Sequence, residues 1–222
     1  MNYTNSDEMK YVLGADGLYS VVVDFKKIKK PLQQFFENSF ASLCEKGMDD
    51  YDTSPHSRLK KIKESMSRYI ETKWWESKQG IYFFSEEAGS GKTLLACIVM
   101  NEIFEKYSVS TQAITMIEIF NKITETFNNE LVSIESVTNP LKAVDILLID
   151  DIGVEKHSEF REESLYDIIN HRMMNNKTTI FTSNKTLDQL PYENRIKSRI
   201  KSMVVQIQMP EIDLRSTFKP KF

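Results

Sequence analysis

The chain has 222 residues, of which 41% are hydrophobic and 11% aromatic, so it carries enough apolar side chain for one packed α/β domain and a modest extension. The formal charge of −3 excludes a generally basic coat for nucleic acid, although a local basic groove is compatible with it. Cys44 and Cys97 form no CxxC pair, which argues against a disulfide scaffold or a structural zinc site. Without a signal sequence or a membrane-length apolar run, we expect a cytoplasmic protein with no membrane partner.

Residues 1–51 are expected to form a small N-terminal extension, separate from a main domain over residues 52–222. A strand is predicted over Tyr19–Phe25, and a helix over Pro31–Cys44, where apolar residues recur on one side. The boundary is placed in the stretch Met48–His56, which is acidic and then turn-prone.

Strand-like and helix-like patterns alternate along the main domain, after a first helix that Ser57 can cap. Short apolar runs typical of buried strands lie at Ile81–Phe84, Gln112–Ile117, Asp145–Ile149, Thr178–Ser183 and Met203–Ile207. Helices are expected between them over Thr93–Lys106, Glu118–Asn129 and Ser158–Met174. Five apolar runs separated by helices predict a five-stranded parallel sheet that is covered by helices on both faces.

A glycine-rich segment, Ala88-Gly89-Ser90-Gly91-Lys92-Thr93, lies directly between the first of these strands and the helix after it. Binding a triphosphate requires backbone N–H groups turned inward, a helix N-terminus that faces the anion, and a mobile cation. Gly89 and Gly91 permit that close approach, because a Cβ would obstruct it. We expect Lys92 to reach the β- and γ-phosphates of ATP and the Thr93 hydroxyl to bind Mg²⁺.

One position departs from the usual pattern of such a loop, because Glu86 stands where its first glycine is expected. A carboxylate near a triphosphate is unfavourable, so we expect a loop that opens differently or binds nucleotide less tightly. The alternative interpretation is a chance turn, which the preceding strand and the following helix make rare.

Two carboxylates, Asp150 and Asp151, end the apolar strand that begins near Asp145. Side chains alternate along a strand, so the two point in different directions and can do different work. Asp150 suits the Mg²⁺ shell, and Asp151 suits polarising the attacking water. The alternative is a strand followed by an ordinary acidic turn. A phosphate loop earlier in the chain makes that alternative less favoured.

Three further polar features follow. Asn184 ends the next strand and can orient the water between Asp151 and the γ-phosphate, although an ordinary turn asparagine is the alternative. Residues 194–201 carry four cations at alternate positions; an arginine that reaches a neighbouring subunit's γ-phosphate would explain one of them, and a solvated basic surface is the alternative. Arg215 follows the last predicted strand.

Together these residues resemble the DnaC/DnaI helicase-loader family of AAA+ ATPases, whose IstB-like relatives in transposition share most of the same features. The resemblance covers about residues 52–222. Its most telling parts are Tyr69-Ile70 ahead of Gly80-Ile81-Tyr82-Phe83-Phe84, Leu148-Ile149-Asp150-Asp151-Ile152-Gly153, Thr182-Ser183-Asn184, Ser198-Arg199-Ile200 and Asp213-Leu214-Arg215. It implies an AAA+ P-loop NTPase fold without a separate C-terminal helical lid. It also implies these roles: Walker A pair Lys92 and Thr93, Walker B pair Asp150 and Asp151, sensor 1 Asn184, trans-acting arginine finger Arg199 (Arg195 being the weaker candidate), and sensor 2 Arg215.

By this resemblance the protein is an ATPase that uses ATP and Mg²⁺ to load a hexameric, DnaB-type replicative helicase onto single-stranded DNA during replication initiation. ATP-bound subunits would associate with the ATP site at their interface, and the N-terminal extension would hold the helicase. Asp151 is shorter than the glutamate of typical AAA+ ATPases, which predicts slow hydrolysis. Two alternatives stay open: an IstB-like transposition ATPase that acts on duplex DNA, and an ATP-binding adaptor without turnover.

Overall fold

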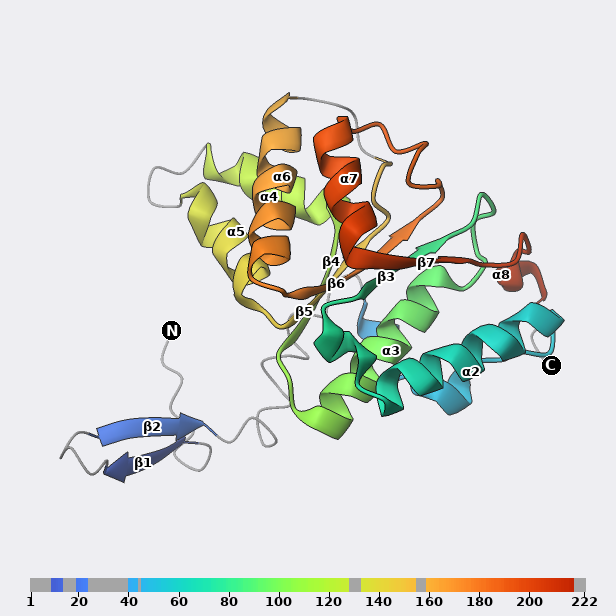
Figure 1. Ribbon diagram of the computed structural model, residues 1–222, viewed down its shortest axis with the longest axis horizontal. Coiled ribbons are helices and arrows are strands. Elements are labelled where there is room, and N and C mark those ends of the chain that lie inside the picture. The colour runs from blue at the N-terminus through green and yellow to red at the C-terminus, as the bar shows by residue number, and fades with distance from the viewer. Residues whose placement is uncertain are drawn as a thin grey trace.

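The computed structural model describes residues 9–13, 19–23, 40–43, 45–127, 133–154 and 159–217 (Figure 1). Near the N-terminus, strands β1 (Met9–Leu13) and β2 (Tyr19–Val23) pair antiparallel. β2 confirms the first predicted strand as far as Val23. The helix predicted over Pro31–Cys44 lies largely outside the described residues, and its described end forms the 3-10 turn η1 (Ala41–Leu43).

The main domain is built on five parallel strands in the spatial order β4-β5-β6-β3-β7. Their bounds are β3 Gly80–Phe84, β4 Thr111–Thr115, β5 Ile146–Asp150, β6 Thr178–Ser183 and β7 Val204–Gln208. This confirms the parallel sheet that the apolar runs predict. Because all strands run the same way, the residues that follow β3, β5, β6 and β7 meet at one edge of the sheet, as ligand sites of such sheets do.

The helices are α2 Ser57–Glu71, α3 Lys92–Tyr107, α4 Met116–Thr126, α5 Ile134–Ala143, α6 Glu159–Met174, α7 Asn194–Met203 and the short α8 Leu214–Thr217. Two 3-10 turns, η2 (Met48–Asp50) and η3 (Trp74–Ser77), flank α2. After β7, the described residues reach Thr217 and form no separate helical lid. No helix in the described part of the chain is both long and apolar enough to cross a membrane.

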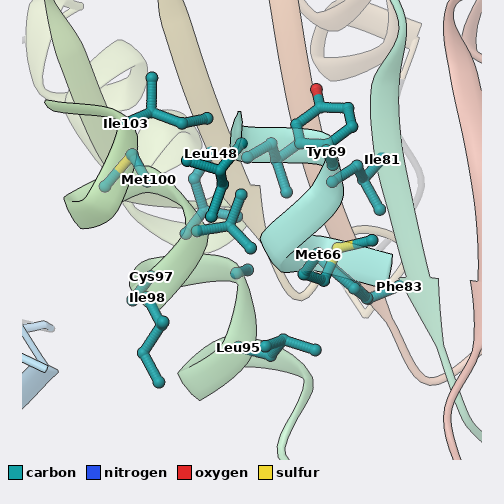
Figure 2. Packing of buried hydrophobic residues seen from close by; sticks show 14 of the residues in the cluster. Met66, Tyr69, Ile81, Phe83, Leu95, Cys97, Ile98, Met100, Ile103 and Leu148 are labelled. Atoms are coloured by element: carbon teal, nitrogen blue, oxygen red, sulfur yellow. The ribbon is translucent and has the colours of Figure 1, made fainter. Parts of the chain in front are cut away.

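Two hydrophobic layers lie on opposite faces of the sheet, because alternate residues of each buried strand point opposite ways. In β3, Ile81 and Phe83 join the layer under α2 and α3, whereas Tyr82 joins the layer under α4, α5, α6 and α7. Figure 2 shows the first layer, where Leu95 of α3 points toward the side that carries Met66 of α2 and Phe83 of β3. The sheet is therefore covered on both faces, as predicted.

Three local predictions require correction. The predicted strand Gln112–Ile117 ends at Thr115, because Thr115 caps α4: its hydroxyl accepts from the Glu118 N–H at 3.1 Å, and the Glu118 carboxylate accepts from the Thr115 N–H at 3.0 Å. The cap of α2 is His56 rather than Ser57, with Nδ1 accepting from the Arg58 N–H at 3.1 Å. Helix α5 was not predicted, since Pro140 lies inside it and obscures the helical pattern.

Residues just before the predicted domain boundary pack onto the main domain. Phe40 and Tyr51 are each 2% exposed and belong to the layer under α2 and α3. Asn101 of α3 donates from Nδ2 to the Leu43 carbonyl at 2.8 Å, and Glu102 of α3 accepts from the Met48 N–H at 3.2 Å. The described residues from 40 onward are thus part of the same core as α3.

Candidate nucleotide site

The loop between β3 and α3 has the conformation that its glycines permit. Gly89 and Gly91 have φ angles of 80° and 84°, in the left-handed region that disfavours other residues. A Cβ on Gly89 would stand 2.1 Å from Asp213 Oδ1, so a side chain there would also displace the Asp213 side chain. Gly91 directly precedes α3, whose free N-terminal N–H groups make a favourable position for an anion.

Lys92, the expected phosphate-binding cation, is 5% exposed and folds back over the loop. Its ammonium donates to the Glu87 carbonyl at 3.0 Å, to Ser90 Oγ at 3.2 Å and to the Ser85 carbonyl at 3.4 Å. Burial lowers the pKa of Lys92, and the nearby carboxylates Asp151, Glu211 and Asp150 oppose that shift. The ammonium is therefore held inside the loop among neutral acceptors that an incoming phosphate can replace.

Asp150 lies between two hydroxyl groups from neighbouring segments. Thr93 Oγ1 donates to Asp150 Oδ1 at 2.8 Å, and Thr182 Oγ1 of β6 donates to the same oxygen at 2.5 Å. Burial raises the pKa of Asp150 to about 6, and the charge of Asp151 adds to that shift, while both hydroxyl bonds and Lys92 oppose it. The predicted proximity of Thr93 and Asp150 is thus present in the structure.

Thr182 is a site residue whose contact the sequence did not identify. Its side chain is fully buried, and its hydroxyl oxygen also accepts from the Asp151 N–H at 2.9 Å. This bond holds Asp151 at a positive φ of 55°, which aspartate tolerates better than most residues. The Thr182-Ser183-Asn184 string indicated that the strand ends near the site. The bonds from Thr182 to Asp150 and Asp151 could not be predicted, because they require β5 and β6 to be neighbours in the sheet.

Asn184 and Arg215 reach the same edge of the sheet from β6 and from the segment after β7. Asn184 is partly buried directly after β6, beside the end of β5 that carries Asp150 and Asp151. Arg215 is exposed, and its charge acts on Lys92 to lower the pKa of that ammonium. The structure thereby brings Lys92, Asp150, Asp151 and Arg215 into one electrostatic cluster.

The segment after β7 is attached to the loop by contacts that were not predicted from the sequence. Glu211 accepts from the Glu87 N–H and from Ser85 Oγ, both at 2.9 Å. Burial alone would raise the pKa of Glu211, but the hydrogen bonds to its carboxylate together outweigh burial and lower it. The Leu214 N–H donates to the Gly89 carbonyl at 3.0 Å. An anionic side chain therefore already uses an N–H group near the start of the loop.

Glu86, the departure from the usual loop pattern, is exposed, and its carboxylate accepts from Gln189 Nε2 at 3.3 Å. This contact ties the carboxylate to the segment between β6 and α7. Ala88, the next expected loop residue, is also exposed.

Arg199 lies in a different environment, on α7 against α6. Its guanidinium donates to Tyr166 Oη at 2.8 Å, to Asn170 Oδ1 at 2.9 Å and to the Arg195 carbonyl at 2.9 Å, and it stacks over the Tyr166 ring at 4.5 Å. None of these partners belongs to the cluster around Lys92. The structure therefore does not bring Arg199 together with the other candidate residues of its own chain.

The donor set fits a magnesium–nucleotide complex. Mg²⁺ prefers oxygen ligands and is usually held by one or two carboxylates together with substrate phosphates and water, rather than by a full protein cage. Within the described residues no group of three or more His, Cys, Asp or Glu side chains could hold a metal. Thr93 and Asp150, with oxygens 2.8 Å apart, are the pair that would contribute to such a shell.

Comparison with known proteins identifies the family. A model of the bacterial DnaA ATPase domain matches residues 60–206, well over half of the chain. The chain belongs to the bacterial DnaA ATPase domain family. The match spans the loop, Asp150, Asp151, Asn184 and Arg199, and confirms that this DnaA-type chain is a nucleotide-binding AAA+ domain.

Curated relatives of this DnaA-type domain include helicase loaders. The replicative helicase loader DnaC of Escherichia coli K12 is 30% identical over 109 residues, which are 49% of this chain and 44% of the relative. The replicative helicase loader DnaI of Bacillus subtilis is 26% identical over 146 residues, 65% of this chain and 45% of the relative. The chain thus spans about half the length of the curated relatives that it matches.

Solved structures confirm the fold of the DnaA-type domain. A DnaI crystal structure superposes with a TM-score of 0.67 at 24% identity, covering 76% of this chain and 93% of that chain. A structure of the DnaC helicase loader superposes with a TM-score of 0.64 at 19% identity, covering 74% of this chain and 96% of that chain. The structure of AMPPCP-bound DnaA from Aquifex aeolicus superposes with a TM-score of 0.62 at 20% identity, covering 73% of this chain and 49% of that chain. At these identities the likeness establishes the AAA+ fold.

Proposed function

We propose that this protein is a Mg²⁺-dependent ATPase and acts as a replicative helicase loader. The observation that carries the ATPase part is the meeting of three elements at one edge of the sheet. A left-handed glycine precedes α3, Lys92 lies inside the loop, and Thr93 contacts Asp150. When bound, Mg²⁺ supplies charge neutralisation at the phosphates.

The chain's own residues would divide the work as follows. The backbone N–H groups of residues 89–93, those of Ser90 and Gly91 included, bind phosphate oxygens. Lys92 exchanges its carbonyl acceptors for the β- and γ-phosphates. Asp151 accepts a proton from the attacking water, which Asn184 orients. Turnover is slow, because the short Asp151 side chain sits in a backbone conformation fixed by Thr182.

The Lys92→Ala protein tests the nucleotide site. Loss of the ammonium should abolish ATP binding in calorimetry, because no other described cation takes its place inside the loop. Lys106→Ala, at the exposed far end of the same helix, is the matched control and should bind ATP normally. Unchanged ATP affinity in Lys92→Ala would remove the phosphate-loop assignment.

The helicase-loading role rests on similarity to proteins named DnaC and DnaI. In this proposal, residues 1–51 include the contact with a hexameric DnaB-type helicase, and the domain over 52–222 binds ATP. Subunits associate so that Arg199 of one reaches the site of the next, and Arg215 acts in its own site. A pull-down of the full chain with the replicative helicase of its host, with and without ATP, tests this role.

Single-stranded DNA is the proposed nucleic-acid partner. Support comes from a shallow surface hollow along α2, lined by Thr53, Lys60, Lys63, Glu64, Ser67 and Arg68. A protein that contacts phosphates through such cations loses affinity as salt rises, in proportion to the number of contacts. Lys60→Ala/Arg68→Ala should flatten that salt dependence, whereas Lys78→Ala/Lys106→Ala should not. Filaments that form on duplex DNA, without affinity for the helicase, would instead favour the transposition ATPase.

A further inference from the structure

Helix α6 carries a row of polar side chains that contact α7, which lies beside it (Figure 1). Glu162 accepts from the Glu193 N–H, directly before α7, at 2.9 Å. Further along α6, Tyr166 Oη and Asn170 Oδ1 accept from the Arg199 guanidinium at 2.8 and 2.9 Å. Side chains four residues apart lie on the same side of a helix, so this row faces α7, and two of its contacts end on Arg199.

The two arginines of α7 differ in the charge of their partners. Arg195 is exposed, and its guanidinium pairs with the Glu193 carboxylate at 2.7 Å. Arg199 takes part in none of the ion pairs of the described residues. Its partners are the Tyr166 hydroxyl, the Asn170 amide oxygen and a backbone carbonyl, which are all neutral. The positive charge of Arg199 is therefore not neutralised within its own subunit and can attract an anion from outside it.

The Arg199 guanidinium is held in place but keeps part of its hydrogen-bonding capacity. Of the five N–H donors of a guanidinium, three have partners among the described residues, on Asn170, Tyr166 and the Arg195 carbonyl, so two remain. The side chain is only partly buried. Charged N–H groups that are fixed and still accessible suit the oxygens of a phosphate.

Tyr166 holds Arg199 by two different interactions. Its hydroxyl accepts from Nη2, and its ring lies 4.5 Å from Cζ of the same guanidinium. Asn170 adds a single bond from α6, and the Arg195 carbonyl belongs to α7 itself, so it cannot fix Arg199 relative to α6. An arginine that is oriented in advance loses less side-chain freedom when it meets the charge of a transition state.

We propose that Tyr166 is a positioning residue, which holds the Arg199 guanidinium in the orientation that it takes at the ATP site of a neighbouring subunit. This inference rests on the proposed function, because it takes Arg199 as the arginine that acts on a neighbour's ATP. Tyr166 itself touches no nucleotide. Its effect therefore falls on turnover in the neighbouring subunit and not on ATP binding in its own.

Tyr166→Phe tests this role, because it keeps the ring and removes only the oxygen that accepts from Arg199. Turnover, measured as phosphate release, should fall by about tenfold, the loss expected for one hydrogen bond to a charged group, while ATP affinity in calorimetry stays within about twofold of wild type. Tyr107→Phe is the matched control. It removes a hydroxyl that donates to the Ile70 carbonyl at 3.0 Å in the layer on the other face of the sheet, and it should turn over ATP as the wild type does.

Mixing variants separates positioning from a general effect on the fold. An excess of Asp151→Asn protein supplies an intact Tyr166 and Arg199, so it should raise turnover per Tyr166→Phe subunit toward the wild-type value. An excess of Arg199→Ala protein should give no such rise, because it lacks the arginine. A structural defect in Tyr166→Phe would lie in its own ATP site and would respond to neither protein.

Wild-type turnover in Tyr166→Phe would overturn the inference. It would also be overturned if Asp151→Asn protein restored turnover to Arg199→Ala but not to Tyr166→Phe. If Asp151→Asn protein restored neither variant, the ATP site would not be shared between subunits. That result, wild-type turnover in Arg199→Ala, or a wild-type protein without turnover would instead defeat the proposed function itself.

Discussion

Thr182 Oγ1 donates a hydrogen bond of 2.5 Å to Asp150 Oδ1, which joins the ends of β5 and β6 at the candidate magnesium position. Because the same hydroxyl also accepts from the Asp151 N–H, one side chain orients both members of the acidic pair. A substitution at Thr182 can therefore change the orientation of Asp150 and Asp151 while leaving both carboxylates in the protein.

Thr182→Val removes this donor and acceptor with little change in volume, so we expect Mg²⁺-dependent ATP hydrolysis to fall by about tenfold, equivalent to about 1.4 kcal/mol. Thr182→Ser keeps the hydroxyl and should retain most of the activity. The measurement is steady-state phosphate release as a function of Mg²⁺ concentration. Wild-type turnover in the valine protein would show that the bridge has no part in catalysis.

Asp150→Asn should change how stability depends on pH. The pKa of Asp150 in the folded protein is about 6, above its ordinary value of 3.8, so ionisation destabilises the fold above pH 6 and the cost disappears below about pH 4. Asparagine still accepts from Thr93 and Thr182 but does not ionise. We expect Asp150→Asn to be about 1–3 kcal/mol more stable than wild type at pH 7.5 and equal to it near pH 4.

Urea unfolding of both proteins across that pH range measures this difference. A stability difference that stays constant with pH would contradict the assignment, because it would reflect packing rather than ionisation.

Arg199→Ala should bind ATP within about twofold of wild type and lose hydrolysis by about 10³-fold or more, the effect expected for an arginine finger. Mixing it with Asp151→Asn should restore part of the turnover, since each protein supplies the group that the other lacks. Arg195→Ala is the neighbouring control; its guanidinium is exposed and pairs with Glu193 at 2.7 Å. Absence of rescue in the mixture would count against a site shared between subunits.

Truncation tests where the main domain begins. A protein of residues 52–222 lacks Phe40 and Tyr51, each 2% exposed, and the contacts of residues 43–48 with α3. Its free energy of unfolding should be lower by at least about 3 kcal/mol than that of residues 40–222, the usual cost of removing one buried aromatic side chain. Equal stability of the two would support the boundary after residue 51 that the sequence predicts.

The sequence predicted those parts of the site that are encoded in short contiguous strings. Lys92 and Thr93 follow two glycines, and Asp150 ends an unbroken apolar strand, so local pattern was sufficient. The contacts of Thr182 and Glu211 were not predictable in this way. Glu211 bonds Glu87 across 124 residues, and both contacts depend on the strand order, which alternation of apolar residues does not specify.

The fold shows the same division. The five strands were recognised because each is a short segment rich in β-branched, aromatic or apolar residues, and helical patterns lie between most of them. Helix α5 was missed because Pro140 interrupts the pattern that defines a helix, and the packing of Phe40 and Tyr51 was missed because a short segment before a turn carries no periodic signal.

The attachment of Glu211 to the start of the phosphate loop makes the segment after β7 sensitive to charge. Glu211 and Asp213 both lie against the loop, so the arrival of a polyanion sets like charges side by side. That repulsion acts on the segment that also carries Arg215, whose attraction to the same polyanion opposes it. The last described turn of the chain therefore carries two opposing electrostatic effects of a bound nucleotide.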